Sequence, residues 1–205
     1  MQIFVLGMHR SGTSAVTRII NMMGASLGPA HLIGGPAGDN PKGFWEHIDV
    51  SALNDELLQA LDCRWDDVVG LLTHNLDRLL PEALLQRLRQ IAFQLDTQRP
   101  WVLKDPRLCL TLPVWRPHLE VPVCVLVHRS PVAVAQSLAA RNGLSLMHGV
   151  ALWEQHTRAA LGASQGLPRT VVCYERLLER PLETVNELHQ FLREVDVGGL
   201  RLPSE

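Results

Sequence analysis

The strongest constraint on the fold is a glycine-framed loop between an apolar strand and a helix near the N-terminus. The short run Ile3-Phe-Val-Leu6 leads into Gly7-Met-His-Arg-Ser-Gly-Thr-Ser14, and a helical pattern follows over residues 15–23. Glycines at these places let backbone N–H groups turn inward where the helix begins, which predicts an anion-binding loop. Four side chains supply more hydrogen-bond donors than a plain strand-to-helix turn needs: Arg10, Ser11, Thr13 and Ser14.

The loop departs at one position from the nucleotide-binding pattern G-x-x-x-x-G-K-[ST], because Thr13 replaces the lysine. That lysine reaches the β- and γ-phosphates in ATP- and GTP-hydrolysing enzymes, where a strand-end carboxylate helps to hold magnesium. Here the cation within the loop is Arg10, and Asp105 directly follows Lys104, which makes it a poor dedicated magnesium ligand. The sequence therefore predicts nucleotide-phosphate binding without metal-dependent phosphoryl transfer. A metal-dependent P-loop kinase remains the alternative.

Strand and helix patterns alternate along the rest of the chain. The nearly continuous apolar run 121–127 indicates a strand buried on both faces, as in a parallel sheet. Alternation over the whole length predicts a three-layer α/β/α fold with a central, mainly parallel sheet, in one domain covering residues 1–205. The other expected strands are 101–103 and 169–174, and the other expected helices are 48–61, 81–95, 132–140, a helix from about 146, and 181–193.

Composition excludes several classes of function. A net charge of −2 gives no basic field for nucleic acid. No apolar run approaches the ~20 residues that span a bilayer, and no signal peptide is recognisable, so a cytoplasmic protein without a transmembrane segment is expected. The four cysteines contain no C-x-x-C pair and are expected to be structural thiols, and no metal is assigned to the chain.

Two elements resemble sulfotransferases that use 3′-phosphoadenosine-5′-phosphosulfate (PAPS), of the bacterial type. The first is the loop, which resembles their 5′-phosphosulfate loop, where a Lys or Arg stands at the place of Arg10. The second is an Arg at a strand end with a Ser eight residues later, matched by Arg129 and Ser137. The resemblance implies that this second pair holds the 3′-phosphate. Because carboxyl ends of parallel strands face one crevice, both elements are expected at one site.

The resemblance covers residues 1 to about 193 and implies a P-loop NTPase-like fold, PAPS as co-substrate and no metal. Lys104 resembles the strand-end lysine of the family, and Tyr174 resembles a late tyrosine near the adenine. The residues expected to bind the co-substrate are Arg10, Ser11, Gly12, Thr13, Ser14, Arg129, Ser137 and Tyr174.

Sulfuryl transfer builds negative charge on the leaving oxygen, so cations and amides placed there stabilise the transition state. Arg10, the loop amides and Lys104 suit this role. The alternative for Lys104 is a surface ion pair with Asp105 or Glu46.

The acceptor also needs a general base. Cytosolic members of the family use a His two residues after the strand-end Lys, but Pro106 occupies that position. Branches that resemble the heparan and tyrosylprotein sulfotransferases use a Glu after the first helix, and Glu46 fits that placement. Burial beside two aromatic residues would raise the pKa of Glu46 towards a working range. His47 and Asp105 are the other candidates, and Glu46 alternatively caps a helix or pairs with Lys42.

The sequence thus predicts a PAPS-dependent sulfotransferase that acts on a hydroxyl or amine of a small-molecule, lipid or glycan acceptor. A catalytically silent nucleotide-binding or scaffold protein on the same fold is a further alternative. Many family members end in a glycine- and basic-rich segment, whereas only Arg201 is basic there in this chain, which favours that alternative.

Overall fold

Four parallel strands form the centre of the computed structural model, which describes residues 1–35, 40, 42–72 and 80–202. The strands are β1 (Gln2–Leu6), β2 (Trp101–Lys104), β3 (Pro122–His128) and β4 (Arg169–Cys173), in the order β2-β1-β3-β4. The helices are α1 (Thr13–Met22), α2 (Ile48–Gln59), α3 (Glu82–Asp96), α4 (Leu108–Trp115), α5 (Pro131–Asn142), α6 (Leu146–Ala163), α7 (Tyr174–Glu179) and α8 (Pro181–Glu194). Short 3-10 turns cover Ala30–Leu32, Val69–Leu72 and Arg116–His118.

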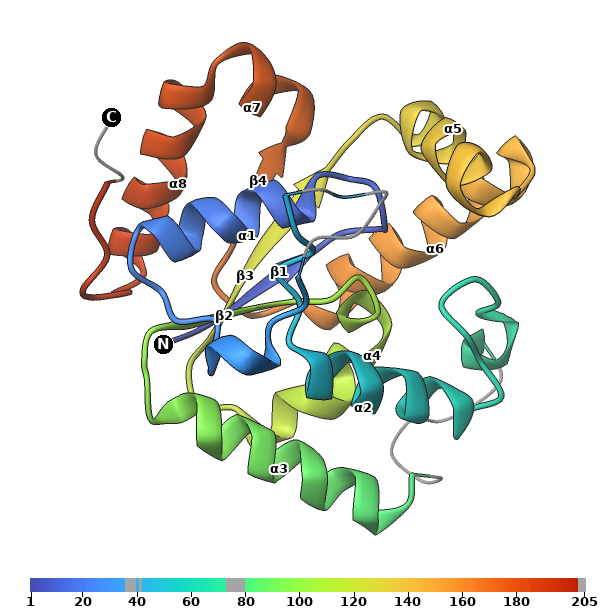
Figure 1. The fold of residues 1–205 in the computed structure, drawn as a ribbon, viewed down its shortest axis with the longest axis horizontal. Coiled ribbons are helices and arrows are strands. Elements are labelled where there is room, and N and C mark those ends of the chain that lie inside the picture. The colour runs from blue at the N-terminus through green and yellow to red at the C-terminus, as the bar shows by residue number, and fades with distance from the viewer. Residues whose placement is uncertain (36–39, 41, 73–79, 203–205) are drawn as a thin grey trace.

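Alternating strand residues build two cores, one on each face of the sheet. Phe4 and Leu6 of β1 belong to a core that includes residues of α2, α3, α4 and α6. Ile3 and Val5 belong to the opposite core, which includes residues of α1, α7 and α8. Figure 1 shows these two groups of helices on opposite sides of the strands. The alternation follows from the two-residue period of a strand, and it confirms the predicted three-layer α/β/α architecture.

Two helices were missed in the sequence. Helix α4 was not predicted because seven of its eight residues are buried, so no amphipathic period marks it, and Pro113 lies inside it. Tyr174 was expected to end a strand, but β4 stops at Cys173 and Tyr174 begins α7. The tyrosine therefore stands at the turn from strand to helix, and its ring lies against Gly12 in the loop after β1.

The order of the strands determines where a ligand would bind. The chain passes from β1 to β2 on one side, and then crosses to β3 on the other side of β1. Crevices at such reversals, outside the carboxyl ends of the strands, are the usual binding places of open α/β sheets. The loop after β1 and the turn after β3 meet at this reversal.

Two expectations from composition bear on the described structure. Cys63, Cys109 and Cys124 are buried and Cys173 is half-buried, and all four thiols are free. In the part of the chain that the structure describes, no helix is long and apolar enough to cross a membrane.

Candidate active site

A cavity of about 1000 Å³ opens at the carboxyl ends of β1, β2 and β3. Its walls come from the loop after β1, one side of α1 along its whole length, Asn40 with residues 42–46, α7, and the first half of α8. Of the predicted site residues, the lining includes Arg10, Gly12, Thr13, Ser14, Glu46, Lys104, Arg129 and Tyr174. The fold thus brings residues from five separate segments to one cavity.

The backbone of the loop requires glycine where it meets Tyr174. Gly12 has a φ of 91°, and a Cβ atom there would lie 2.1 Å from Cδ2 of Tyr174. Arg10 also has a positive φ, of 68°. No side chain among the described residues caps α1, and its first turn contains no acidic residue. The positive end of the α1 dipole therefore faces the cavity without a compensating negative charge, as an anion site requires.

Direct contacts join the loop to the turn after β3. Arg10 Nε donates to Oγ of Ser137 at 2.8 Å, and a guanidinium N–H of Arg129 donates to the carbonyl oxygen of Arg10 at 2.7 Å. The Arg129 guanidinium also lies 5.2 Å from the ring centroid of Tyr174. Ser137 does not line the cavity itself, and Ser11 is fully buried behind the loop. The two predicted phosphate-binding elements form one connected cationic wall.

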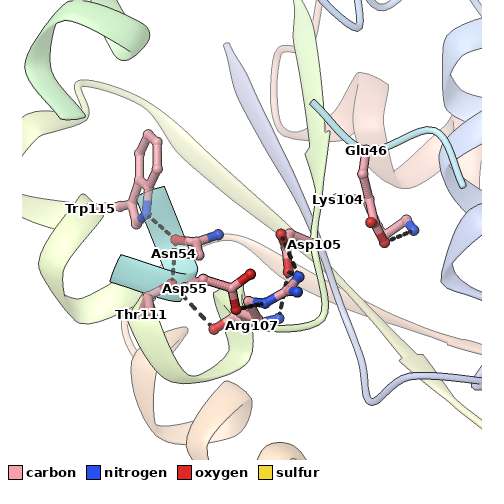
Figure 2. A network of polar contacts seen from close by, with 8 residues as sticks. All are labelled: Glu46, Asn54, Asp55, Lys104, Asp105, Arg107, Thr111 and Trp115. Carbon is pink, nitrogen blue, oxygen red and sulfur yellow. Dashed lines mark hydrogen bonds and ion pairs between the residues drawn. The ribbon is translucent and has the colours of Figure 1, made fainter. Parts of the chain in front are cut away.

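Lys104 and Glu46 form a buried ion pair on another wall of the cavity. Nζ of Lys104 lies 2.6 Å from Oε1 of Glu46, with side-chain exposures of 2% and 21% (Figure 2). Burial raises the pKa of Glu46; the positive charge of Lys104 opposes this shift, and Asp105 adds to it. The Lys104 ammonium also lies 6.0 Å from the ring centroid of Phe44. The ion pair with Glu46 thus exists, but it is buried rather than on the surface.

The segment that carries Glu46 is held by contacts of its own. Asn40 Nδ2 donates to the carbonyl oxygen of Gly43 at 2.7 Å, which closes a tight turn. Trp45 has a φ of 58°, and its ring lies 4.5 Å from the guanidinium of Arg18 on α1. This cation–π contact ties the segment to α1 and so fixes Glu46 at the cavity.

The other two base candidates are turned away from the cavity. Asp105 accepts hydrogen bonds from the backbone N–H of Arg107 at 2.8 Å and from its guanidinium at 3.1 Å to each oxygen. His47 is buried at the N-cap position of α2, and burial lowers its pKa. Neither residue lines the cavity, whereas Glu46 does. The role of Glu46 as base remains a prediction that this placement supports.

Behind Asp105, a polar network fixes the end of β2 to two helices. Arg107 Nε contacts a carboxylate oxygen of Asp55 at 2.5 Å. Oδ1 of Asn54 accepts from Thr111 Oγ1 at 2.9 Å and from Trp115 Nε1 at 3.0 Å. Figure 2 shows this network beside the Lys104–Glu46 pair. Its contacts join α2 to α4, so they anchor the strand end that presents Lys104.

His9 lines the cavity, although the sequence analysis gave it no role. Its ring centroid lies 4.5 Å from that of Trp65, and its buried Nε2 has no hydrogen-bond partner among the described residues. Burial holds the pKa of His9 well below its usual range, and the positive charge of Arg107 adds to this shift. The signal in the sequence was its position next to Arg10, inside the loop.

Fold and site together define an α/β protein of the P-loop NTPase-like type, with a glycine-containing loop after β1 and a buried lysine–carboxylate pair beside it. The chain belongs to the sulfotransferase family, whose model matches residues 2–196. This result confirms the family that the sequence resembles. No curated protein sequence matches the chain.

Solved sulfotransferase structures share the fold at low identity. The sulfotransferase domain from the olefin synthase of Synechococcus PCC 7002 has a TM-score of 0.56 and 17% identity over 94% of this chain and 73% of that one. The sulfotransferase domain of the curacin biosynthetic pathway has a TM-score of 0.53 and 17% identity over 93% of this chain and 73% of that domain. Sulfotransferase STF9 from Mycobacterium avium gives 0.54 and 15%, over 94% of this chain and 63% of that one.

Proposed function

We propose that the chain transfers a sulfuryl group from PAPS to a hydroxyl or amine of a small-molecule, lipid or glycan acceptor. The observation that carries the proposal is the connected wall of Arg10, Arg129, Ser137 and Tyr174 around the anion-binding loop. This wall gathers two cations and the uncapped start of α1, which suits a ligand with two separate anionic groups.

The residues present fit the nucleotide in a specific way. Loop amides 11–14 and Arg10 would hold its 5′-phosphosulfate, and Arg129 would hold its 3′-phosphate. Ser137, which does not line the cavity, would reach this phosphate if its hydroxyl leaves Arg10 Nε, and otherwise it orients Arg10. Tyr174, whose ring lies against Gly12, would contact the adenine. PAPS supplies the sulfuryl group when bound.

The Lys104–Glu46 pair is suited to the chemical step. Oε1 of Glu46 would take the proton of the acceptor hydroxyl, because its raised pKa makes this carboxylate a stronger base than an exposed one. Lys104 Nζ would then turn from Glu46 towards the developing charge on the leaving oxygen. The buried setting strengthens both interactions.

The cavity also has room for part of an acceptor. Its volume of about 1000 Å³ lies at the upper end of the range for ligand pockets. Apolar side chains of α1, α7 and α8 contribute to its lining: Ile19, Met22, Leu177, Leu178, Leu182 and Val185.

The proposal is tested by two calorimetric titrations, one with 3′,5′-adenosine bisphosphate (PAP) in the absence of metal and one with ATP and magnesium. We expect PAP to bind more tightly than ATP–magnesium, and Arg10→Ala to weaken PAP binding by about 10-fold or more, since it removes a charged hydrogen-bond donor. Arg158→Ala is the matched control, because Arg158 is exposed on α6 and pairs only with Glu154 among the described residues.

Three outcomes would reject the proposal. Tight ATP–magnesium binding with no PAP response would favour the kinase alternative. PAP affinity and sulfuryl transfer that both survive Arg10→Ala would show that the loop has another role. PAP binding without transfer to any acceptor tested would favour the silent nucleotide-binding alternative.

A further inference from the structure

The ends of β3 and β4 carry a second group of chemically active side chains, outside the cavity. His128, Cys173 and Glu175 each offer one ligand atom, and these three atoms lie within 4.8 Å of one another. His128 and Cys173 are directly paired in the parallel register of β3 and β4. Glu175 follows two residues later, in the first turn of α7. A nitrogen, a sulfur and an oxygen donor therefore meet at one place.

This group faces away from the proposed sulfuryl-transfer site. Arg129 and Tyr174, which line the cavity, are the sequence neighbours of His128 and Cys173. None of the three ligand-type residues lines that cavity. The group is also accessible, because His128 is exposed and the other two are half-buried.

Existing contacts already orient the donors. The backbone N–H of Ser130 donates to Oε1 of Glu175 at 2.8 Å, which leaves Oε2 directed to Cys173, whose Sγ lies 3.3 Å away. The His128 ring packs edge-on against Trp153 at a centroid distance of 5.7 Å. The hydrogen bond from Ser130 to Glu175 is an outer contact of the kind that orients the ligands of metal sites.

We propose that His128, Cys173 and Glu175 form a zinc-binding site. Thiolate, imidazole and carboxylate together are the ligands of Zn²⁺, whereas Mg²⁺ and Ca²⁺ prefer oxygen alone. Ligand atoms of one tetrahedral zinc ion are roughly 3.5 Å apart, so small rotations of these accessible side chains suffice. A thiolate, a carboxylate and a neutral imidazole balance the charge of Zn²⁺, and a water molecule takes the fourth position.

Binding exchanges a proton for the metal. The Cys173 thiol, which now donates to Glu175, releases its proton to the buffer, and its sulfur then bonds to Zn²⁺. The Glu175 oxygen that accepted this hydrogen bond becomes a ligand of the same ion. No electron is transferred.

Such a site would link the end of β3 to the end of β4, the strand at the edge of the sheet. It would fix the turn after β3 relative to the start of α7, and so stabilise the folded chain. The sequence analysis assigned no metal here, because 44 residues of chain lie between His128 and Cys173, and only the parallel register pairs them. The site does not depend on the proposed sulfuryl transfer.

Two metal titrations of the full chain test the proposal. Zn²⁺ alone is followed by calorimetry, and Co²⁺ alone is followed by absorption spectroscopy. We expect one ion per chain and a heat of binding that changes with the buffer, because the buffer takes up the released proton. We also expect a thiolate-to-cobalt charge-transfer band, and a raised thermal midpoint with Zn²⁺. Cys173→Ser should abolish the band. His128→Ala and Glu175→Gln should each weaken Zn²⁺ binding by about 10-fold or more. His31→Ala is the control, because His31 is also exposed but lies in the turn Ala30–Leu32.

Absence of saturable Zn²⁺ binding would overturn the proposal. Binding and a charge-transfer band that persist in Cys173→Ser would overturn it as well, since the sulfur would then come from another cysteine. His128→Ala guards against a folding artefact, because truncating an exposed side chain leaves the core intact. Unchanged affinity in this variant would therefore also contradict the site.

Discussion

Lys104 and Asp105 are consecutive residues at the end of β2, yet they have opposite environments. Lys104 points into the cavity and has one ion-pair partner among the described residues, Glu46. Asp105 points into the protein and accepts three hydrogen bonds from Arg107. Figure 2 shows the two charged groups on either side of the strand end.

The difference lies in how completely each charge is satisfied. Both side chains are almost fully buried, with exposures of 2% for Lys104 and 1% for Asp105. A carboxylate whose oxygens are occupied by one guanidinium and one amide is fixed, because any rearrangement leaves a buried charge unpaired. The buried Lys104 ammonium has a single carboxylate partner and lies at a cavity, so it can exchange the contact with Glu46 for a contact with a substrate. Replacing the two residues should therefore affect different properties of the protein.

Replacement of Lys104 should have the largest effect on activity. Lys104→Met keeps most of the side-chain volume, and we expect it to lower kcat for sulfuryl transfer about 100- to 1,000-fold through loss of a transition-state cation. Stability should fall less than with Asp105→Ala, because Glu46 is partly exposed at the cavity and can take up a proton when its partner is removed. Steady-state kinetics and urea unfolding measure both effects. Turnover within a few-fold of the unmodified enzyme would show that Lys104 has only a structural role.

Replacement of Asp105 should instead lower stability. Asp105→Ala leaves the Arg107 guanidinium with one partner in a largely buried place, and we expect a loss of about 3 kcal/mol in urea unfolding. Asp55→Asn is the matched control at the other partner of Arg107, and its exposed carboxylate predicts a loss of less than about 1 kcal/mol. A stable Asp105→Ala protein without turnover would make Asp105 the base in place of Glu46.

Glu46→Gln should remove the acid limb of the pH–rate profile. The unmodified enzyme should lose activity as pH falls through the raised pKa of Glu46, because the base must be ionised to accept a proton. The variant should be about 100-fold slower, with a flatter profile over this range. Glu154→Gln, on the exposed face of α6, should retain the limb. An acid limb that survives in Glu46→Gln would assign it to another group.

The smallest expected effect concerns His156, a fully buried residue that, like Asp105, should affect stability rather than activity. Burial lowers its pKa from 6.5 to about 4, so its contribution to stability is present above 6.5 and is lost as pH falls towards 4. The unfolding free energy should fall by about 2 kcal/mol between about pH 7 and pH 5. His156→Gln should reduce this dependence of stability on pH, and His9, whose pKa is also lowered, should account for part of the dependence that remains. Replacement of the exposed His31 by Ala should leave the dependence unchanged. Equal slopes would show that His156 titrates alike in the folded and the unfolded chain.

The site divides into residues that the sequence could identify and residues that it could not. Gly12 and Arg10 stand out from motif spacing, because a loop of fixed length between a strand and a helix has few possible shapes. His9 escaped notice because its burial depends on Trp65, more than fifty residues away in the chain. Helix α4 escaped because burial on all sides erases its amphipathic period.

The sequence by itself determined the alternation of strands and helices, the position of the glycine-framed loop between β1 and α1, and the family, because these depend on local spacing and on which residues avoid water. The tertiary structure decided which of three acidic or basic candidates lines the cavity, and it paired His128 with Cys173. Both results follow from side-chain direction and strand register, which are set by packing between segments far apart in the chain. Neighbouring residues such as Lys104 and Asp105 thus receive opposite environments that no local pattern distinguishes.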